Sequence, residues 1–342
     1  MKSIGREIRM SIKDMCFEHP TFVEVKEPVV QRIHDTMDGL KPCFLMVLGT
    51  SRCGKTEVMK AIASQFESER IGGRKSIPFL VVNVRTGSGV QALDEAVIAA
   101  LGVRTKIRGE SAIRTFMHEQ LALANVRVIW FDEASHLVER GANITPEKAA
   151  DWFKELYDNK LQIGIVLSGI PSLKRLLKDN PQLANRTTKP VYFLPYRYDD
   201  PDHRQAFADS VALFQSLFEE RGCTFSIDQN TMVRHCYAIS AGQIGVLSDF
   251  FDELARLITA PTKITFELCE QASSSKNLPC PDYIKPFCQE KIEDHQLMEI
   301  LCSELGKHKL SLPILEHRTV EEEPSAAPEL KDLYDSIGKA HQ

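Results

Sequence analysis

Short continuous apolar runs alternate with segments of helical spacing through residues 43–197. Each run predicts a strand that is buried on both faces, because a half-exposed strand would alternate apolar with polar residues. Strands are expected at residues 43–49, 77–84, 126–134, 161–169 and 190–196. The last run contains two prolines, which favours a position at the edge of a sheet because proline lacks a backbone donor.

The segments between these runs place apolar residues at the three- and four-residue spacing of an amphipathic helix. Helices are expected at residues 56–66, 92–102, 112–124, 146–158 and 172–186, the last one interrupted before Pro181. Strands that alternate with helices predict a mostly parallel sheet with helices on both faces. The expected fold class is therefore α/β, with a five-stranded sheet.

The pattern changes from about Pro201, where strand signals vanish and helical spacing dominates. Further helices are expected at residues 202–222, 244–258 and 293–308. Before the sheet, residues 19–25 are expected to form a loop that leads into a helix at 28–37. The expected parts are a helical lead-in, an α/β domain, a small all-helical domain and a partly disordered C-terminal extension, at residues 1–42, 43–197, 198–262 and 263–342.

The composition is that of a soluble globular protein, with 43% apolar and 26% charged residues. No apolar run approaches the roughly 18 residues of a membrane span, and the charged N-terminus lacks the apolar core of a secretory signal. The nine cysteines form no C-x-x-C pair, which favours reduced thiols in a cytoplasm. The net charge of −5 excludes a globally basic nucleic-acid binder but allows a local basic stripe.

A phosphate-binding motif follows the first expected strand. Residues 49–56, with the sequence GTSRCGKT, fit the pattern G-x-x-x-x-G-K-[ST] between a strand and a helix. The glycines let backbone N–H groups converge on a phosphate, and the positive end of the helix dipole faces it. Lys55 is expected to reach the β- and γ-phosphates of ATP, and Thr56 to ligate magnesium. The expected nucleotide contacts are Gly49, Thr50, Ser51, Arg52, Cys53, Gly54, Lys55, Thr56 and Glu57.

Two acidic residues, Asp132 and Glu133, stand at the carboxyl end of the third expected strand, where open α/β sheets bind ligands. Asp132 is expected to hold magnesium through water, and Glu133 to activate the attacking water as a general base. Polar residues also end two other strands. Asn83 either holds Glu133 inactive until a ligand arrives or caps a turn, and Ser168 is a candidate contact for the γ-phosphate or the attacking water.

Arg186 ends the expected helix at 172–186, just before the fifth strand. An arginine at this place usually points out of the subunit and can reach the γ-phosphate that a neighbour holds, which makes hydrolysis depend on oligomerisation. The alternative is a solvated surface arginine. The sequence alone leaves both hypotheses open.

Four segments together, GTSRCGKTE, WFDEASHL, IVLSGIPSLKRLL and NPQLANR, resemble an AAA+ ATPase that has a small helical lid. They are similar, more narrowly, to the TnsC/TniB transposition regulators, which are relatives of MuB. The resemblance covers roughly residues 15–260. The phosphate-binding motif is generic, whereas the segment from Gly169 to Arg186 is much more specific.

The resemblance implies that the protein binds ATP and magnesium, assembles as a ring or helical filament on duplex DNA, and marks a target site. It implies recruitment or stimulation of a DDE transposase, loading by a target selector of the TniQ type, and a bacterial cytoplasmic location on DNA. The nucleotide, magnesium and arginine-finger residues that it implies are Lys55, Thr56, Asp132, Glu133 and Arg186. Gly245 departs from the pattern, because many AAA+ lids carry a sensing arginine there, so slow hydrolysis is expected.

The family's DNA contacts lie on loops after the second strand and before the third, and both regions are basic here. Lysine and arginine beside small hydroxyl residues suit contacts to phosphates, which position a protein on DNA without reading its sequence. The stripe lacks aromatic residues for base stacking, which argues against single-stranded DNA. The candidate DNA residues are Arg85, Thr86, Arg104, Thr105, Lys106, Arg108, Ser111 and Arg114. A solvated charged loop is the alternative.

Two other functions remain open. An origin initiator or helicase loader has a related AAA+ build, although no winged-helix pattern follows the second domain here. A signalling ATPase would need a sensor domain, for which the chain has no room. The last residues, 322–342, place Leu330, Leu333 and Ile337 on one helical stripe, which suits either a helix that binds the transposase or a disordered tail.

Overall fold

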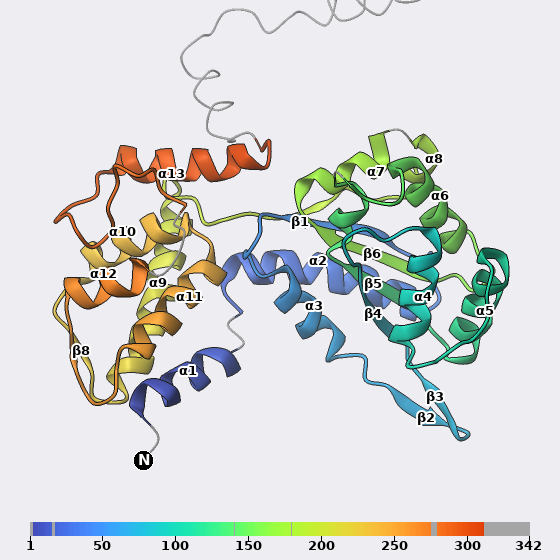
Figure 1. The fold of residues 1–342 in the computed structure, drawn as a ribbon, viewed down its shortest axis with the longest axis horizontal. Coiled ribbons are helices and arrows are strands. Elements are labelled where there is room, and N and C mark those ends of the chain that lie inside the picture. Colours follow the sequence, from blue (N-terminus) through green and yellow to red (C-terminus); the bar gives the residue numbers. More distant parts are fainter. Residues whose placement is uncertain (1–2, 16–17, 140, 179, 275–278, 311–342) are drawn as a thin grey trace, which may run out of the picture.

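The structure is a computed structural model that describes residues 3–15, 18–139, 141–178, 180–274 and 279–310. A sheet of five parallel strands forms the core of the first domain, in the order β4-β5-β6-β1-β7 (Figure 1). The strands are β1 (Phe44–Gly49), β4 (Phe79–Asn83), β5 (Val128–Asp132), β6 (Gly164–Gly169) and β7 (Val191–Phe193). All five expected strands are present, and β7 lies at the edge, as its prolines predict.

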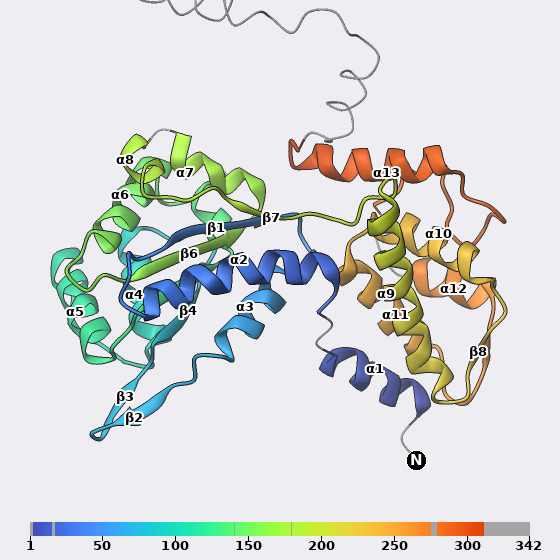
Figure 2. The same cartoon turned by 180° about the vertical axis from the view of Figure 1, so that it is seen from behind.

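Helices cover both faces of this sheet (Figures 1 and 2). One face packs against α2 (Pro20–Met37) and α3 (Lys55–Ala63) through a core that includes Leu45 and Val47 of β1. The other face contributes Met46 and Leu48 to a second core. Alternate residues of one strand thus enter two cores, which is why the strand has no polar position. The helices of the second face are α4 (Val90–Ala100), α5 (Glu110–Leu123), α6 (Pro146–Tyr157), α7 (Arg175–Lys178) and α8 (Pro181–Ala184).

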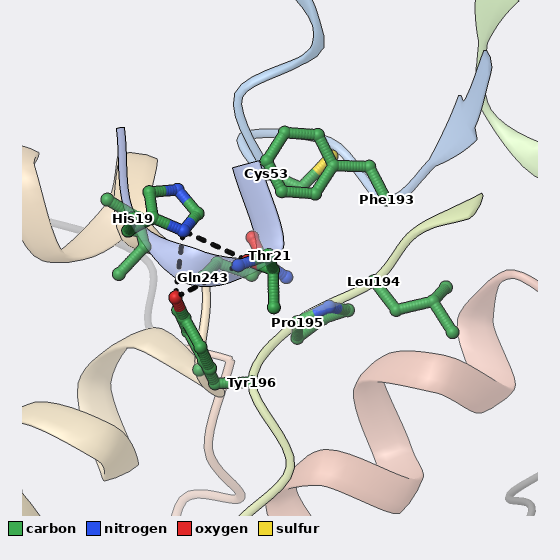
Figure 3. A pocket seen from close by; sticks show the side chains of 10 residues that line it. His19, Thr21, Cys53, Phe193, Leu194, Pro195, Tyr196 and Gln243 are labelled. Carbon is green, nitrogen blue, oxygen red and sulfur yellow. Dashed lines mark hydrogen bonds between the residues drawn. The ribbon is translucent and has the colours of Figure 1, made fainter. Parts of the chain in front are cut away.

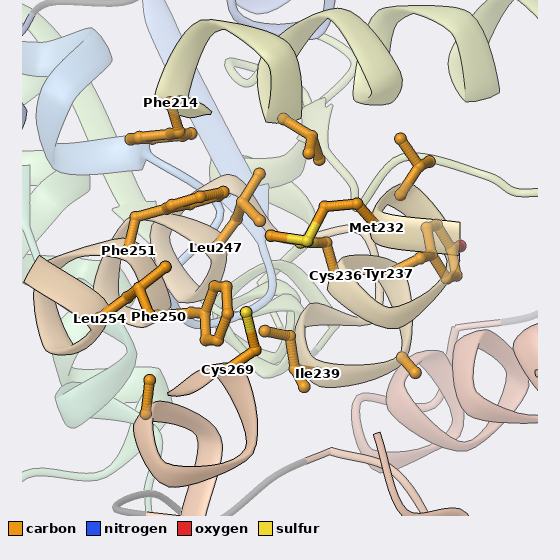
Figure 4. Close-up of a cluster of buried hydrophobic side chains, with 14 of the residues drawn as sticks. Phe214, Met232, Cys236, Tyr237, Ile239, Leu247, Phe250, Phe251, Leu254 and Cys269 are labelled. Atoms are coloured by element: carbon orange, nitrogen blue, oxygen red, sulfur yellow. The ribbon is translucent and has the colours of Figure 1, made fainter. Parts of the chain in front are cut away.

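A second, mainly helical unit packs around its own core (Figure 4). Phe214 and Phe251 stack there with ring centroids 5.0 Å apart, beside Met232 and Leu247. Its elements include α9 (Pro201–Glu219), α10 (Gln229–Ser240), α11 (Ile244–Arg256), α12 (Phe266–Ser274) and α13 (Asp294–Lys307). Two short parallel strands that the pattern did not predict are β8 (Thr224–Phe225) and β9 (Lys263–Ile264). None of the described helices has the length and apolar character that a membrane crossing requires.

The helical unit, called the lid from here on, is larger than the sequence predicted. Helix α1 (Ile4–Asp14) packs against α11 and α9, and its Ile8 is fully buried in the lid core. Phe287 and Ile300, from the expected C-terminal extension, belong to the same core. Residue 262 therefore does not separate two units, and the lid comprises α1 together with α9 to α13. The expected tail at 322–342 lies outside the described residues.

Helix α2 begins at Pro20, although the sequence predicts a loop over residues 19–25. Pro28 lies inside this helix, where a proline removes one hydrogen bond and crowds the preceding turn, at a cost of about 3 kcal/mol or more. Burial of Phe22, Val25 and Val29 against the sheet offsets that cost. Tertiary packing therefore overrides the local signal that favours a loop.

An insertion between α3 and β4 forms a hairpin of β2 (Glu69–Ile71) and β3 (Arg74–Ser76). Both views show it extending away from the rest of the sheet domain (Figures 1 and 2). Its two turn residues are glycines with positive φ angles, as a two-residue hairpin turn requires. The hairpin leads into the amino end of β4, so it lies at the opposite edge of the sheet from the phosphate-binding motif.

Candidate nucleotide-binding site

The phosphate loop, residues 49–54, connects the carboxyl end of β1 to the start of α3. Gly54 has a φ of 108°, a left-handed conformation that glycine adopts without strain. Its carbonyl accepts hydrogen bonds from the N–H groups of Glu57 and Val58, which starts α3 directly behind the loop. The positive end of this helix dipole therefore faces the loop.

The Lys55 side chain is folded into the phosphate loop. The residue is only 6% exposed, and its ammonium donates to the carbonyls of Gly49 at 3.0 Å and Thr50 at 2.7 Å. The Thr50 hydroxyl is buried and has no hydrogen-bond partner in the part of the chain that the structure describes. A buried cation and an unsatisfied hydroxyl beside a helix N-terminus are groups that a bound phosphate satisfies.

Asp132, the last residue of β5, is held from two sides. The Thr56 hydroxyl donates to its Oδ2 at 3.0 Å, and the Ser168 hydroxyl donates to its Oδ1 at 2.6 Å. The Trp130 indole Nε1 donates in turn to the Ser168 oxygen at 2.8 Å, which fixes that hydroxyl. A hydroxyl and a carboxylate beside the phosphate loop are oxygen ligands of the kind that Mg²⁺ prefers. Thr56 and Asp132 therefore fit a magnesium ion.

Ser168 occupies a place different from the one that we expected. A contact to the γ-phosphate would need its hydroxyl proton, and that proton is donated to Asp132. The residue is also fully buried, at 0% exposure. In this structure Ser168 is therefore a positioning residue for Asp132.

Glu133 follows Asp132 with an exposed side chain and a φ of 54°. Left-handed backbone is uncommon outside glycine, and such strain concentrates at functional sites. Asn83, at the end of β4, lies in register with Asp132 and is exposed as well. Within the described ranges no hydrogen bond joins Asn83 to Glu133, so the inhibitory contact that we considered is not formed in this structure.

Arg186 is bound within its own subunit. Its guanidinium makes two hydrogen bonds of 2.8 Å to the carboxylate of Asp158, and a third of 2.6 Å to the carbonyl of Gln182. The Arg186 and Asp158 side chains are 29% and 40% exposed, and exposed ion pairs contribute at most about 1 kcal/mol. A phosphate group that approaches from outside the subunit can therefore compete for this arginine.

A narrow pocket lies where the sheet domain, the phosphate loop and the lid meet (Figure 3). Its walls include the start of α2, Cys53 of the loop, the segment after β7 and the turn between α10 and α11. His19 Nδ1 lies 2.8 Å from the Tyr196 hydroxyl and 2.9 Å from the Thr21 hydroxyl. The space is too small for a water-sized molecule, so the pocket is closed. Apart from Cys53, the sequence did not indicate these residues, because they come from distant segments.

Burial lowers the pKa of His19 from 6.5 to about 4. The unfolded chain therefore binds a proton at this residue below about pH 6.5, whereas the folded protein does so only near pH 4. The contribution of neutral His19 to the free energy of unfolding is fully present above pH 6.5. This contribution, up to about 3 kcal/mol, is lost as the pH falls from 6.5 to 4. Urea unfolding at neutral pH and near pH 5 measures this loss, and His19→Gln is expected to reduce it. An unchanged pH dependence in that variant would contradict the assignment.

The sequence family is decided by a match over the sheet domain. The family described as "Bacterial TniB protein" matches residues 13–193, just over half of the chain. This chain belongs to the TniB family. The TniB match contains the phosphate loop, Asp132 and Arg186 and ends with β7, so most of the lid lies beyond it. No curated protein is similar to the chain in sequence.

Solved structures with the same fold include proteins from Aeropyrum pernix and Pyrobaculum aerophilum. The ORC1 protein of Aeropyrum pernix, in complex with DNA, has a TM-score of 0.56 at 17% identity, covering 78% of this chain and 69% of its own. The ORC2 protein of Aeropyrum pernix, in ADPNP–ADP complexes, has a TM-score of 0.52 at 13% identity, covering 77% of this chain and 71% of its own. Cdc6p from Pyrobaculum aerophilum has a TM-score of 0.53 at 12% identity, covering 87% of this chain and 84% of its own. At such identities the likeness shows the fold alone, which is the AAA+ ATPase fold.

Most of the basic residues that we expected to contact DNA are exposed in this TniB chain. They are Arg85 after β4, and Arg104, Lys106 and Arg108 between α4 and α5. The hydroxyl residue Thr86, next to Arg85, is exposed as well. None of these cations forms an ion pair with a described acidic residue. Ser111 is also exposed, at the start of α5, whereas Thr105 accepts a hydrogen bond from the Ile107 N–H at 3.0 Å. Phosphate groups can therefore reach both loops.

Arg114 has a different environment. Its guanidinium donates to both carboxylate oxygens of Asp94, at 2.8 and 2.9 Å, and to Glu155 at 2.6 Å. Asp94 is fully buried and also accepts from the Trp152 indole at 2.8 Å. Loss of Arg114 would leave a buried carboxylate without its counter-ion, which costs about 3–5 kcal/mol. We therefore assign Arg114 a structural role and exclude it from the DNA surface.

Proposed function

We propose that this protein binds ATP with magnesium at the phosphate loop and hydrolyses it. Lys55 exchanges the carbonyls of its own loop for the β- and γ-phosphates, while Thr56 and Asp132 hold the magnesium ion. A magnesium ion held there would neutralise charge on the phosphates, and Glu133 would accept a proton from the attacking water. The contact between Thr56 and Asp132 beside Lys55 is the observation that carries this proposal, because it gathers the expected magnesium residues at the loop.

The adenine base is proposed to enter the pocket between the sheet domain, the phosphate loop and the lid, called the junction pocket from here on. Cys53 belongs to both the phosphate loop and the pocket wall, so a nucleotide whose phosphates lie on the loop has its base within reach. Burial raises the pKa of the Cys53 thiol, which keeps this wall neutral and apolar. Because the pocket is closed, entry of a base requires the lid to tilt away from the sheet domain.

The second part of the proposal is assembly on duplex DNA as a ring or helical filament that recruits or activates a DDE transposase. Membership of the TniB family supports this assignment. The exposed cations of the two loops suit phosphate contacts. Each subunit of an oligomer would repeat these contacts along the DNA, and many weak contacts together would give stable binding. Arg186 would then leave Asp158 for the γ-phosphate of a neighbour. A TniQ-like selector is the proposed loading partner.

Electron microscopy with duplex DNA and a slowly hydrolysed ATP analogue tests this function. Rings or filaments that enclose DNA are expected with the analogue and are not expected without nucleotide. The Lys55→Ala variant serves as the control, because it lacks the phosphate-binding cation and should remain unassembled. Monomers that stay off the DNA in the presence of the analogue would overturn the proposal.

An origin initiator or helicase loader is the second candidate function, since ORC1 and Cdc6p share the fold. Reconstitution separates the two candidates. Stimulation of strand transfer by a DDE transposase encoded beside this gene supports the first one. Loading of a replicative helicase, without an effect on transposition, supports the second.

A further inference from the structure

The first turn of α11 lies directly on the phosphate loop. The backbone N–H of Gly245 donates to the carbonyl of Arg52 at 3.0 Å. A Cβ at position 245 would lie 2.4 Å from that carbonyl oxygen, which is closer than atoms approach without a shift. The lid therefore contacts the loop through backbone, and this contact leaves no room for an arginine at residue 245.

A second contact joins the same two elements. The guanidinium of Arg52 forms an ion pair with Asp249, one helical turn after Gly245 on α11. Arg52 has a φ of 64°, so its carbonyl meets the start of α11 while its side chain reaches along the helix. One loop residue thus binds the lid through both its backbone and its side chain.

The turn that precedes α11 is itself anchored. Gln243 donates from its side-chain amide to Glu304 of α13 at 2.8 Å, and both residues are buried. The carbonyl of Gly242 accepts from the Tyr196 N–H at 3.0 Å. The turn therefore moves with the body of the lid, and a tilt of the lid must break the contacts to Arg52.

We infer that Arg52 and Asp249 hold the lid against the phosphate loop and thereby set the rate at which nucleotide leaves. The cation of this pair belongs to the phosphate loop and the carboxylate belongs to the lid. In lids that supply a sensing arginine, the cation belongs to the lid instead. Breaking this pair favours the tilted lid, which opens the junction pocket. The inference rests on the proposed nucleotide site, and Arg52 and Asp249 are positioning residues that act through the lid.

Release of a fluorescent ADP derivative from the full-length protein, followed by stopped flow, tests the inference. Asp249→Asn is expected to speed release about two- to fivefold, the range for an exposed ion pair. Gly245→Ala should speed it roughly tenfold, because its methyl group meets backbone. Asp249→Glu, which keeps a carboxylate on α11 and leaves the phosphate loop unchanged, should retain slow release.

Asp252→Asn is the matched control, since this carboxylate lies on the same helix but pairs with Arg9 and Arg256. Its release rate should equal that of the unmodified protein. An unchanged rate in Asp249→Asn, or equal acceleration in Asp249→Asn and Asp252→Asn, would overturn the role of the pair. Failure of the unmodified, folded protein to bind the ADP derivative is a separate outcome that overturns the nucleotide site itself.

Discussion

Replacement of Arg186 by alanine is expected to lower DNA-stimulated ATP hydrolysis about 1000-fold, within the range for the loss of an arginine finger. Each subunit should still bind ATP, because Arg186 follows α8 and pairs with Asp158 rather than with the phosphate loop. Hydrolysis is measured by phosphate release on saturating duplex DNA. Binding of a fluorescent ATP analogue to the DNA-free protein is measured in parallel.

Asp158→Asn distinguishes a finger from a structural arginine. This variant breaks the same ion pair but keeps the guanidinium, so it should retain hydrolysis. Mixing supplies a second test, because Glu133→Gln subunits lack the general base but still present Arg186. Arg186→Ala and Glu133→Gln, each inactive alone, should regain activity at about a quarter of the interfaces when mixed in equal amounts. Equal losses in Arg186→Ala and Asp158→Asn, with no recovery on mixing, would exclude a finger that acts between subunits.

Loss of the loop cations is expected to have the second largest effect. The triple change of Arg104, Lys106 and Arg108 to alanine removes up to three phosphate contacts from each subunit. Duplex affinity in the presence of the ATP analogue should fall at least about 100-fold at moderate salt, and the salt dependence of binding should become shallower. Fluorescence anisotropy over a range of salt concentrations measures both quantities.

The β2–β3 hairpin supplies the control for this experiment. Arg70 and Lys75 are exposed and lie opposite each other on the hairpin, which precedes β4. Their joint change to alanine should leave duplex affinity within about twofold if the loops form the DNA surface. Normal binding by the loop variant together with weak binding by the hairpin variant would place DNA on the hairpin instead of the two loops.

The sheet domain could be predicted from the sequence because each of its signals is local. An uninterrupted apolar run defines a strand with two buried faces, and the glycine-rich motif defines the loop that follows β1. The same reasoning predicted which side chains gather at the carboxyl edge. Thr56 and Asp132 indeed meet there, at 3.0 Å.

The features that could not be predicted depend on contacts between distant segments. Pro28 suggests the start of a helix, and only the packing of Phe22 against the sheet extends α2 back to Pro20. Arg114 lies within a basic stripe, yet the buried Asp94 that binds it is 20 residues away in the sequence. Ser168 ends a strand like a sensing residue, but the neighbouring strand places Asp132 within reach of its hydroxyl.

The lid is connected to the sheet domain by two stretches of chain, one between α1 and α2 and the other between β7 and α9. The His19 Nδ1 and the Tyr196 hydroxyl, one from each stretch, lie 2.8 Å apart, so the two connections contact each other beside the phosphate loop. Helix α9, with 19 residues, extends about 28 Å away from this region. If the lid tilts about this contact, the end formed by β8 and β9 is expected to move further than the end at the loop. A spectroscopic probe on β8 or β9 would then register the state of the nucleotide.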